Sequence, residues 1–582
     1  MAIAMGWHKP DNVAGTSAPA IMVGLFVASA GLLFGYDTGS INGILAMRQF
    51  KDQFSTGYIN PVGGLPDLTT KESSIVVAIL SAGTFTGSIA SAPVADSFLG
   101  RRFSLLASCI VFCLGGILQT VATALPMLMA GRYIAGVGVG AISVIAPLYQ
   151  SEMAPKWIRG TLVCAYQLSI TFGLLISSII SIITHTMQNN PAAYRIPLGL
   201  QLVWAVVLSL GLTILPETPR FLVKQGRTEE AGLSLSRLRR LDITHPALLD
   251  ELQEIVANHE YELSLGPDTY MGLFRGSPHL GRRTFTGCGL QILQQLSGIN
   301  FIMYYSTTFF TGAGIEDPYT KSLILNVINV VATVPGIMVI ESWGRRKLLI
   351  IGAIGMAVCQ LLIASFTAAA GDDLQSVAQT ILIAFCSINI SFFAASWGPV
   401  AWVVTSEIYP LKVRAKAMSI STSANWALNF AISYGAPFMV NADNGAADMG
   451  PKIFFIWGAC CIVAIGFVWC MVYETSKISL EQIDEMYERV DHAWNSTRFE
   501  PSWSFQQIVD EGWSPSGQEP LEHELEHAHS TSSSTLDSGA SSGSSATMIS
   551  PPPPVATSNS NSSSDSSTNK WASQMGNVDF SY

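Results

Sequence analysis

Long hydrophobic runs alternate with short polar stretches along most of this chain, from about residue 19 to residue 473. An α-helix needs about 20 mainly apolar residues to cross the hydrocarbon core of a bilayer, because each residue advances the helix by only about 1.5 Å. Runs of about this length occur at residues 19–46, 74–95, 103–124, 126–149, 161–184, 198–215, 285–311, 321–341, 347–369, 377–405, 415–436 and 452–473. The pattern therefore predicts an all-α membrane protein with twelve transmembrane helices.

One polar signature occurs twice in the loops between these runs, about 250 residues apart. Its two copies are Gly100-Arg101-Arg102, Ser151-Glu152 and Arg159, then Gly344-Arg345-Arg346, Ser406-Glu407 and Arg414. In both copies an arginine follows the glutamate by seven positions. The chain is thus predicted to be a duplication of two pseudo-symmetric six-helix bundles, which is typical of transporters that rock one half against the other.

Composition supports a chain embedded in lipid, since 49% of the residues are hydrophobic and only 12% are charged. All nine cysteines fall inside the predicted spans, so we expect no disulfides. The sequence offers no cluster of metal ligands, no nucleophile with a base, and no phosphate-binding loop, which argues against an enzyme and against a metal or cofactor. The net charge of −10 comes largely from the C-terminal region and indicates no nucleic-acid partner.

Lys and Arg concentrate in the loops on one side of the predicted bilayer, as at Arg101, Lys156 and Lys412, whereas the opposite loops carry acids such as Asp372 and Asp443. Basic loops remain in the cytoplasm. Both termini and the linker at 217–284 are therefore expected to be cytoplasmic. The first apolar run is too long for the core of a signal peptide, so we expect it to remain as the first helix.

These boundaries divide the chain into six predicted regions. They are an N-terminus (1–18), a first half (19–216), a linker with short helices (217–284), a second half (285–473), a cap helix (474–495) and a tail (496–582). The tail is rich in Ser, Thr, Asn and Pro and is too poor in large apolar side chains to bury a core, which predicts disorder. It is either a passive solvated tail or a regulatory one that is phosphorylated, and the sequence favours neither.

Two charged residues stand out inside the predicted spans, where a charge costs roughly 3 kcal/mol or more unless it is offset. Asp37 lies in the first span and Arg132 in the fourth. We predict that they pair, with Arg132 keeping Asp37 ionised until a proton arrives from outside, so that Asp37 is the proton carrier. The alternative is a fixed ion pair that only locks the two helices together.

Polar side chains crowd the seventh span, where Gln291, Gln294 and Gln295 lie within five residues and are too costly to face lipid. A neutral polyol suits such a place, because a buried hydroxyl without a partner costs about 1–3 kcal/mol and aromatic rings can cover its C–H faces. Further amides and rings at bilayer depth are Gln167, Asn300, Tyr304, Tyr305, Asn329, Trp402, Asn425 and Trp426. Interhelical hydrogen bonding explains any one of them better, but the set predicts a sugar cavity.

The chain resembles the sugar porter family of the major facilitator superfamily, in particular fungal hexose transporters, over roughly residues 20–490. The resemblance lies in the two Gly-Arg-Arg motifs, in Pro216-Glu217-Thr218-Pro219-Arg220, in Gln-Gln-Leu-Ser-Gly-Ile-Asn at 294–300 and in Tyr473-Glu474-Thr475. It implies a plasma-membrane carrier that moves hexoses, D-glucose above all, by alternating access.

The same resemblance implies roles for individual residues. The family's sugar contacts fall on Gln167, Gln294, Gln295, Asn300, Asn329 and Trp402, with Tyr304 and Tyr305 in the segment that closes over the sugar. Asn425 stands before Trp426 where proton-coupled bacterial relatives have Gln. Aspartate at position 37 is similar to proton-coupled members and implies symport, although some fungal facilitators carry it too, so a hexose uniporter is an alternative.

The resemblance further implies a latch of ion pairs that holds the cytoplasmic ends together when the carrier is open outward. Its members would be Arg101, Arg102, Glu152, Arg159, Glu217, Arg220, Arg345, Arg346, Glu407 and Arg414. Ser97 and Ser342 replace the usual basic residues after Asp96 and Glu341, which implies a weaker latch. Fungal glucose sensors also resemble these carriers, so a receptor that signals through a partner of its C-terminal tail is a second alternative.

Overall fold

The computed structural model describes residues 14–59, 64–96, 99–187, 190–264, 269–276, 279–312, 317–369, 375–440, 449–476, 478 and 480–499. Helices form almost all of the regular structure in these residues. The β pairing that these residues contain is a single bridge between Ile59 and Pro66. The all-α prediction is therefore confirmed. Ser97, the loop acids Asp372 and Asp443, and nearly all of the predicted tail lie outside the described residues.

Twelve helical segments follow the twelve hydrophobic runs. They are α1 with α2 (Ala18–Ala28, Ala30–Leu45), α4 (Thr70–Ala95), α5 (Gly100–Val121), α6 (Leu125–Met153), α7 (Arg159–Thr184), α8 (Ala192–Leu212), α13 with α14 (Leu280–Leu296, Ile299–Gly312), α15 (Pro318–Trp343), α16 (Arg345–Ala369), α17 with α18 (Gln375–Ala395, Trp397–Glu407), α19 (Arg414–Val440) and α20 (Ile453–Met471). The fold class predicted from the hydrophobic pattern is thus confirmed.

Ten segments of the described residues are long and apolar enough to cross a membrane. The two that fall short are the seventh and the eleventh, and the reason is physical. The seventh is divided into α13 and α14, while α19 begins with Arg414 and Lys416 and carries many Ser and Asn side chains. Both place polar groups on a face that is buried in protein, which lipid-facing helices avoid.

Gly298 divides the seventh span because its backbone adopts a positive φ of +75°. A Cβ atom there would lie 2.5 Å from the Trp457 side chain of α20. Glycine alone meets both conditions, since it has no Cβ and adopts positive φ at little cost. The break redirects α14 and presents the amides at the end of α13 to the space between the halves.

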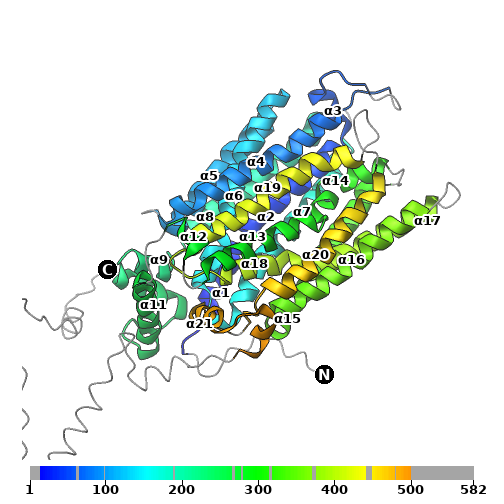
Figure 1. Ribbon diagram of the computed structural model, residues 1–582. Coiled ribbons are helices and arrows are strands. Elements are labelled where there is room, and N and C mark those ends of the chain that lie inside the picture. The colour runs from blue at the N-terminus through cyan, green and yellow to red at the C-terminus, as the bar shows by residue number, and fades with distance from the viewer. Residues whose placement is uncertain are drawn as a thin grey trace, which may run out of the picture. The chain divides into compact units, whose positions relative to one another are not determined.

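The two halves lie side by side, with the blue and cyan helices of the first half next to the green, yellow and orange helices of the second (Figure 1). Within the first half, α4 and α5 both pack on α6, and α2 packs on α7. Between the halves, α19 packs along α4, and α15 packs along α7. These two seams hold the bundles together and leave room between them.

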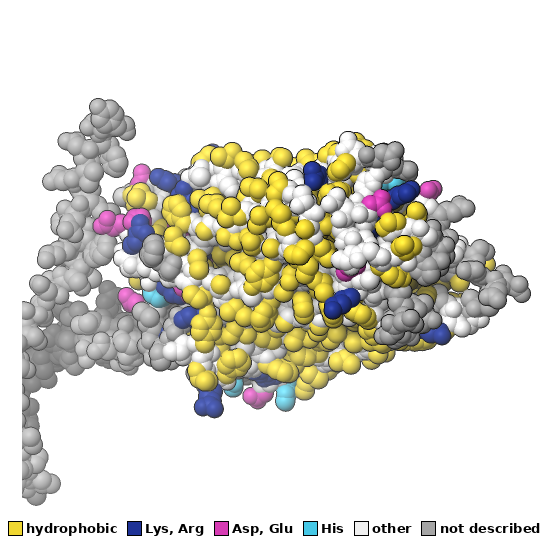
Figure 2. Space-filling view, turned by 90° about the horizontal axis from the view of Figure 1, so that it is seen from above, with side chains coloured by type: hydrophobic (Ala, Val, Ile, Leu, Met, Phe, Trp, Pro, Cys, Tyr) yellow, Lys and Arg dark blue, Asp and Glu magenta, His cyan; other side chains and the backbone are white. Residues whose placement is uncertain are grey.

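Short helices gather at one end of the bundles, which we call the basic end because Arg101 and Arg345 lie there. They are α9 (Pro219–Lys224), α10 (Thr228–Arg239), α11 (Pro246–Ser264), α12 (Gly272–Arg275) and α21 (Leu480–Arg489). Figure 1 shows α9, α11 and α21 at this end. Hydrophobic side chains cover the broad middle of the visible face, and charged side chains gather mainly toward its two ends (Figure 2). This distribution fits a body embedded in a bilayer.

Candidate functional site

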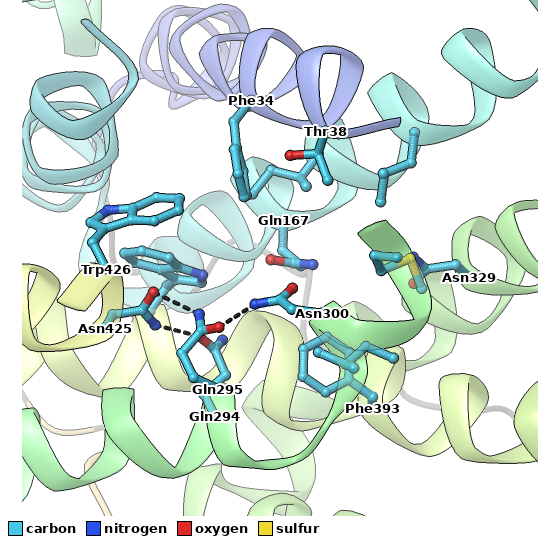
Figure 3. A pocket seen from close by; sticks show the side chains of 15 residues that line it. Phe34, Thr38, Gln167, Gln294, Gln295, Asn300, Asn329, Phe393, Asn425 and Trp426 are labelled. Carbon is cyan, nitrogen blue, oxygen red and sulfur yellow. Dashed lines mark hydrogen bonds between the residues drawn. The ribbon is translucent and has the colours of Figure 1, made fainter. Parts of the chain in front are cut away.

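A pocket lies between the two halves, because its walls come from both of them. The pocket together with the open space at its mouth amounts to about 590 Å³. Eight of the ten predicted substrate residues line it, namely Gln167, Gln294, Gln295, Asn300, Asn329, Trp402, Asn425 and Trp426 (Figure 3). The first half supplies mainly apolar groups and the second half most of the amides, so the pocket is chemically two-sided.

The amides of α13 and α19 hold one another in place. Gln295 Nε2 donates to Asn425 Oδ1 at 2.7 Å, and Asn425 Nδ2 donates to Gln294 Oε1 at 2.9 Å. Asn300 donates to Gln295 Oε1 (Figure 3). Gln294 Nε2 in turn donates to the main-chain oxygen of Trp397 at 3.0 Å. This network orients several donors and acceptors before any ligand arrives, which lowers the entropic cost of binding.

Two further polar atoms of the pocket are not fully satisfied among the described residues. Asn329 Oδ1 is buried and accepts no hydrogen bond there, and Thr38 Oγ1 is buried near the Tyr304 hydroxyl without a hydrogen bond of good geometry. Because an unsatisfied buried polar atom costs about 1–3 kcal/mol, a ligand hydroxyl at either place recovers that free energy. The pocket therefore suits a neutral molecule that carries several hydroxyl groups.

Aromatic rings and aliphatic side chains form the remaining walls. Phe34 meets the Trp426 ring edge to face, with 5.0 Å between the ring centroids, and Tyr166 meets Trp402 in the same way at 5.9 Å. The Trp426 Nε1 group donates to Ser143 Oγ at 3.0 Å, so its polar edge is satisfied by the first half. The flat faces of these rings match the C–H faces of a sugar ring.

The pocket also contains residues that the sequence did not predict, including Phe34, Thr38 and Phe393. An apolar ring in an apolar span carries no cost, so nothing in the sequence separates Phe34 or Phe393 from a lipid-facing ring. Thr38 directly follows Asp37, so its position beside a buried charge could have indicated that it faces the interior of the protein.

Tyr304 and Tyr305, predicted to close over the substrate, do not line the pocket. The Tyr304 hydroxyl donates to Asn429 Oδ1 at 3.2 Å, and the Tyr305 hydroxyl donates to the main-chain oxygen of Ser433 at 2.7 Å. Both bonds fasten α14 to α19. The two tyrosines therefore act in this conformation as anchors beside the pocket.

The structure brings Asp37 and Arg132 together, as the sequence predicted. Arg132 Nη2 lies 3.6 Å from Asp37 Oδ2, and both side chains are at most 1% exposed. Arg132 Nε donates to the main-chain oxygen of Val76 on α4 at 2.6 Å. Neither carboxylate oxygen of Asp37 has a hydrogen-bond partner within the described residues. The carboxylate is thus balanced by charge alone, and protonation would remove a buried charge that no hydrogen bond from the described residues stabilises.

At the basic end the first copy of the repeated motif forms a compact cluster. Arg101 Nε lies 3.2 Å from Glu152 Oε2, and its Nη1 lies 3.0 Å from Asp96 Oδ1. Glu217 accepts the backbone N–H groups of Arg101 and Arg102 at 3.2 and 3.1 Å. Burial raises the pKa of Glu217 above the ordinary glutamate value, and the backbone N–H groups of Thr218 and Arg102 oppose that rise.

The second copy repeats the arrangement. Arg345 Nη2 lies 2.9 Å from Glu407 Oε1, and its Nη1 lies 2.7 Å from Glu341 Oε2. Glu474 accepts the backbone N–H groups of Arg345 and Arg346 at 2.9 and 3.1 Å, as Glu217 does in the first copy. Glu474 was not among the predicted gate residues. A parallel in the sequence identifies it, because Tyr473-Glu474-Thr475 follows the twelfth span as Pro216-Glu217-Thr218 follows the sixth.

The other predicted gate arginines have different partners. Arg102 donates to the main-chain oxygen of Leu212 at 2.9 Å, Arg346 to that of Trp469 at 2.7 Å, and Arg414 to that of Tyr409 at 3.0 Å. Arg159 and Arg220 line a small cavity beneath the first half. Arg102 and Arg346 therefore cap the C-terminal ends of α8 and α20, and the ion pairs between Arg101 and Glu152 and between Arg345 and Glu407 each lie within one half.

The halves nevertheless touch at the basic end. A Cβ on Gly160 of α7 would lie 2.5 Å from both Arg345 Nη2 and Glu341 Oε1, so the first half packs directly on the second cluster. Lys224 Nζ lies 3.1 Å from Asp96 Oδ2 and donates to the main-chain oxygen of Lys412 at 3.3 Å. These contacts join the two halves at the basic end.

The halves also touch at the opposite end. Asn42 Nδ2 donates to Ser306 Oγ at 3.0 Å, and Asn42 Oδ1 accepts the Thr307 backbone N–H at 3.2 Å. The rings of His185 and Tyr319 stack with 4.4 Å between their centroids. Contacts between the halves are therefore present at both ends of the bundles.

Comparison with known proteins agrees with this geometry. Residues 23–487 match the family described as "Sugar (and other) transporter". The chain is 64% identical over 523 residues to the "Probable glucose transporter rco-3" of Neurospora crassa, covering 89% of this chain and 88% of that protein. It is 41% identical over 483 residues to the "High glucose sensor RGT2" of Saccharomyces cerevisiae, covering 82% of this chain and 62% of that protein.

Solved structures show the same similarity. The proton:xylose symporter XylE bound to 6-bromo-6-deoxy-D-glucose is 27% identical, covers 81% of this chain and 100% of its own, and gives a TM-score of 0.70. XylE in the inward open conformation is 26% identical, covers 80% and 99%, and gives a TM-score of 0.60. The chain therefore superposes better on the sugar-bound XylE structure than on the inward open one.

Proposed function

This chain belongs to the family of sugar transporters, and on that premise we propose that it carries hexoses, D-glucose above all, across the plasma membrane by alternating access. The observation that supports this most is the pocket itself. Its oriented amides, its unsatisfied polar atoms and its aromatic walls suit a polyol, and contacts between the halves are present at both ends of the bundles. Opening one set of contacts at a time exposes the pocket to one side of the membrane.

We place the basic end and both termini in the cytoplasm. Positively charged loops remain on that side during membrane insertion, and the arginine clusters and α9–α12 lie at this end. Gln167, Gln294, Gln295, Asn300, Asn329, Trp402, Asn425 and Trp426 are the proposed sugar contacts. The clusters around Arg101 and Arg345 form the proposed gate.

Transport is proposed to be sugar–proton symport, with Asp37 as the proton carrier and Arg132 as its partner. The support is the loosely held carboxylate, which is buried against one arginine without hydrogen bonds in the described residues. The structurally similar XylE is titled a proton:xylose symporter. Coupling to one proton would supply about 2.3 kcal/mol per 100 mV of membrane potential.

A glucose sensor is the second candidate, and one observation favours it. The relative RGT2 is a glucose sensor by name, and here about 80 residues rich in Ser, Thr and Pro follow the last described helix. Such a tail offers binding or modification sites to a signalling partner. A facilitative uniporter differs from the main proposal only in lacking the proton.

Uptake of radiolabelled D-glucose by fungal cells without hexose carriers of their own tests these proposals. A symporter accumulates the sugar, and a protonophore abolishes the accumulation. Uptake that equilibrates and ignores the protonophore would indicate a uniporter. Correctly localised protein without uptake would contradict transport and move the sensor to first place.

A further inference from the structure

A second asparagine of α19 connects the pocket to the first half. Asn429 lies one helical turn beyond Asn425 and is fully buried. It does not line the pocket. We propose that Asn429 is a positioning residue that couples sugar binding at Gln295 to movement of the first half. This inference rests on the proposed hexose transport.

Its carboxamide joins three helices. Asn429 Nδ2 donates to Gln295 Oε1 on α13 at 3.0 Å. Its Oδ1 accepts the Tyr304 hydroxyl on α14 at 3.2 Å and the Ser81 hydroxyl on α4 at 2.7 Å. Gln295 and Tyr304 belong to the second half and Ser81 to the first. One side chain therefore connects a proposed sugar contact with the opposite half of the molecule.

The bonds of Gln295 explain how the connection responds to a ligand. Gln295 Oε1 accepts from both Asn300 and Asn429, and its Nε2 donates to Asn425. Asn300 lines the pocket, so a sugar hydroxyl competes with it for Gln295. Asn429 lies behind the pocket and stays in contact. A change in the Gln295 carboxamide is thus passed to Asn429 and from there to Ser81 and Tyr304.

The same helix that carries Ser81 also contacts the buried charge pair. Val76, five residues before Ser81 on α4, accepts the Arg132 Nε–H group at 2.6 Å. Tyr304 lies close enough to Asp37 and Arg132 to interact with their charges. The Asn429 carboxamide therefore lies between the sugar pocket and the proposed proton site. In a coupled carrier, binding at one of these sites must change the binding free energy at the other.

A passive role in the seam between α4 and α19 is the alternative, and the seam offers a matched control. Ser423 Oγ and Ser88 Oγ form a hydrogen bond of 2.9 Å in the same seam. Ser423 does not line the pocket. The Ser423→Ala substitution removes a bond between the halves without touching a proposed sugar contact.

The test uses the full chain, purified and reconstituted in liposomes, with D-glucose counterflow and D-glucose binding measured separately. Asn429→Ala is expected to lower the maximal exchange rate about tenfold, since about 1.4 kcal/mol corresponds to that factor. The dissociation constant should change by less than about threefold, because Asn425 and Asn300 still hold Gln295. Ser81→Ala should slow exchange in the same way, and adding it to Asn429→Ala should have little further effect.

Several results would overturn the inference. The first is an exchange rate of Asn429→Ala equal to that of the wild type. The second is weaker D-glucose binding by Asn429→Ala with an unchanged maximal exchange rate, and the third is an equal slowing of exchange by Ser423→Ala. If Asn429→Ala does not fold, as gel filtration would show, Ser81→Ala against Ser423→Ala decides the matter. Wild-type protein that exchanges no hexose would contradict the proposed function and this inference together, whereas slow variants beside an active wild type support both.

Discussion

Gln295 carries the proposed sugar site at the scale of single residues, because its carboxamide lies in the pocket and has three amide partners. Gln295→Ala is expected to weaken hexose binding by at least about tenfold, since a ligand hydroxyl loses its partner and the surrounding amides lose their orientation. Binding of D-glucose to purified protein measures the effect.

Gln119→Ala is the control for this variant. Gln119 is also fully buried, but it lies on α5 and does not line the pocket. It should leave the affinity unchanged. Wild-type affinity in the Gln295 variant would contradict the proposed site.

Asp37 is the residue on which proton coupling depends. Asp37→Asn keeps the size of the side chain but can no longer take up and release a proton. The variant is expected to lose accumulation of D-glucose against a gradient while it retains counterflow, because exchange needs no net proton movement. Vesicles with an imposed pH gradient measure both quantities, and full accumulation by the variant would remove Asp37 from the coupling role.

Sequence reasoning located most of the residues whose burial is costly and missed apolar ones such as Phe34, whose burial is cheap. Asp37, Arg132 and Gln294 were found because a charge or an amide inside a span demands a partner. Asn429 carries the same signal, at a spacing of four from Asn425, but its partner Ser81 is 348 positions away in the chain. No local pattern reveals such a contact, and only the packing of α4 on α19 does.

Among the helices, the broken seventh span most directly shapes the pocket. Gly298→Ala is expected to destabilise the protein, because an alanine at positive φ costs about 1 kcal/mol and its Cβ would collide with Trp457. Thermal unfolding of the purified protein should shift downward and hexose binding should fall with it.

Gly466→Ala on α20 is the matched control for this helix break. A Cβ at Gly466 meets no atom within 4 Å, and alanine favours a helix interior over glycine. The control should be neutral or slightly stabilising. Equal effects of the two substitutions would show that the positive φ at Gly298 is not required.

The repeated motif predicted the gate clusters but not their connections. Spacing alone relates Arg101 to Arg345, yet it cannot say whether an arginine pairs within its own half or across to the other. In the structure the ion pairs of Arg101 with Glu152 and of Arg345 with Glu407 lie within each half, and contacts at Gly160 and Lys224 join the halves. Glycine packing of this kind leaves no mark in a hydrophobicity pattern.

At the scale of the whole molecule, counting hydrophobic runs was enough to predict the fold class. In lipid each span must satisfy its own backbone hydrogen bonds, and a helix does so. The conformation was not predictable in the same way. Contacts between the halves are present at both ends of the bundles, and they depend on pairs such as Asn42 with Ser306, which are 264 positions apart. These contacts must break in turn during transport, so their free energies are expected to be small and similar.

Two truncations separate what the C-terminal region contributes. Every residue of the pocket, the charge pair and the gate clusters lies before residue 500. Ending the chain after Phe499 is therefore expected to leave stability and hexose counterflow unchanged. Loss of counterflow in this variant would contradict that expectation and would mean that the sequence beyond Phe499 takes part in transport.

Ending the chain after Ser476 should instead destabilise the second half. It removes α21 and the turn of 3-10 helix at Ala493–Arg498, which bind Arg283 through Asp484 and Arg346 through the main-chain oxygen of Ala493. Arg283 is fully buried, and stranding such a charge costs roughly 3–5 kcal/mol. The chain that ends after Ser476 should therefore unfold at a lower temperature than the chain that ends after Phe499. Equal unfolding temperatures of the two truncated chains would show that the cap formed by α21 is dispensable. If the chain that ends after Phe499 lost signalling and nothing else, that result would favour the sensor.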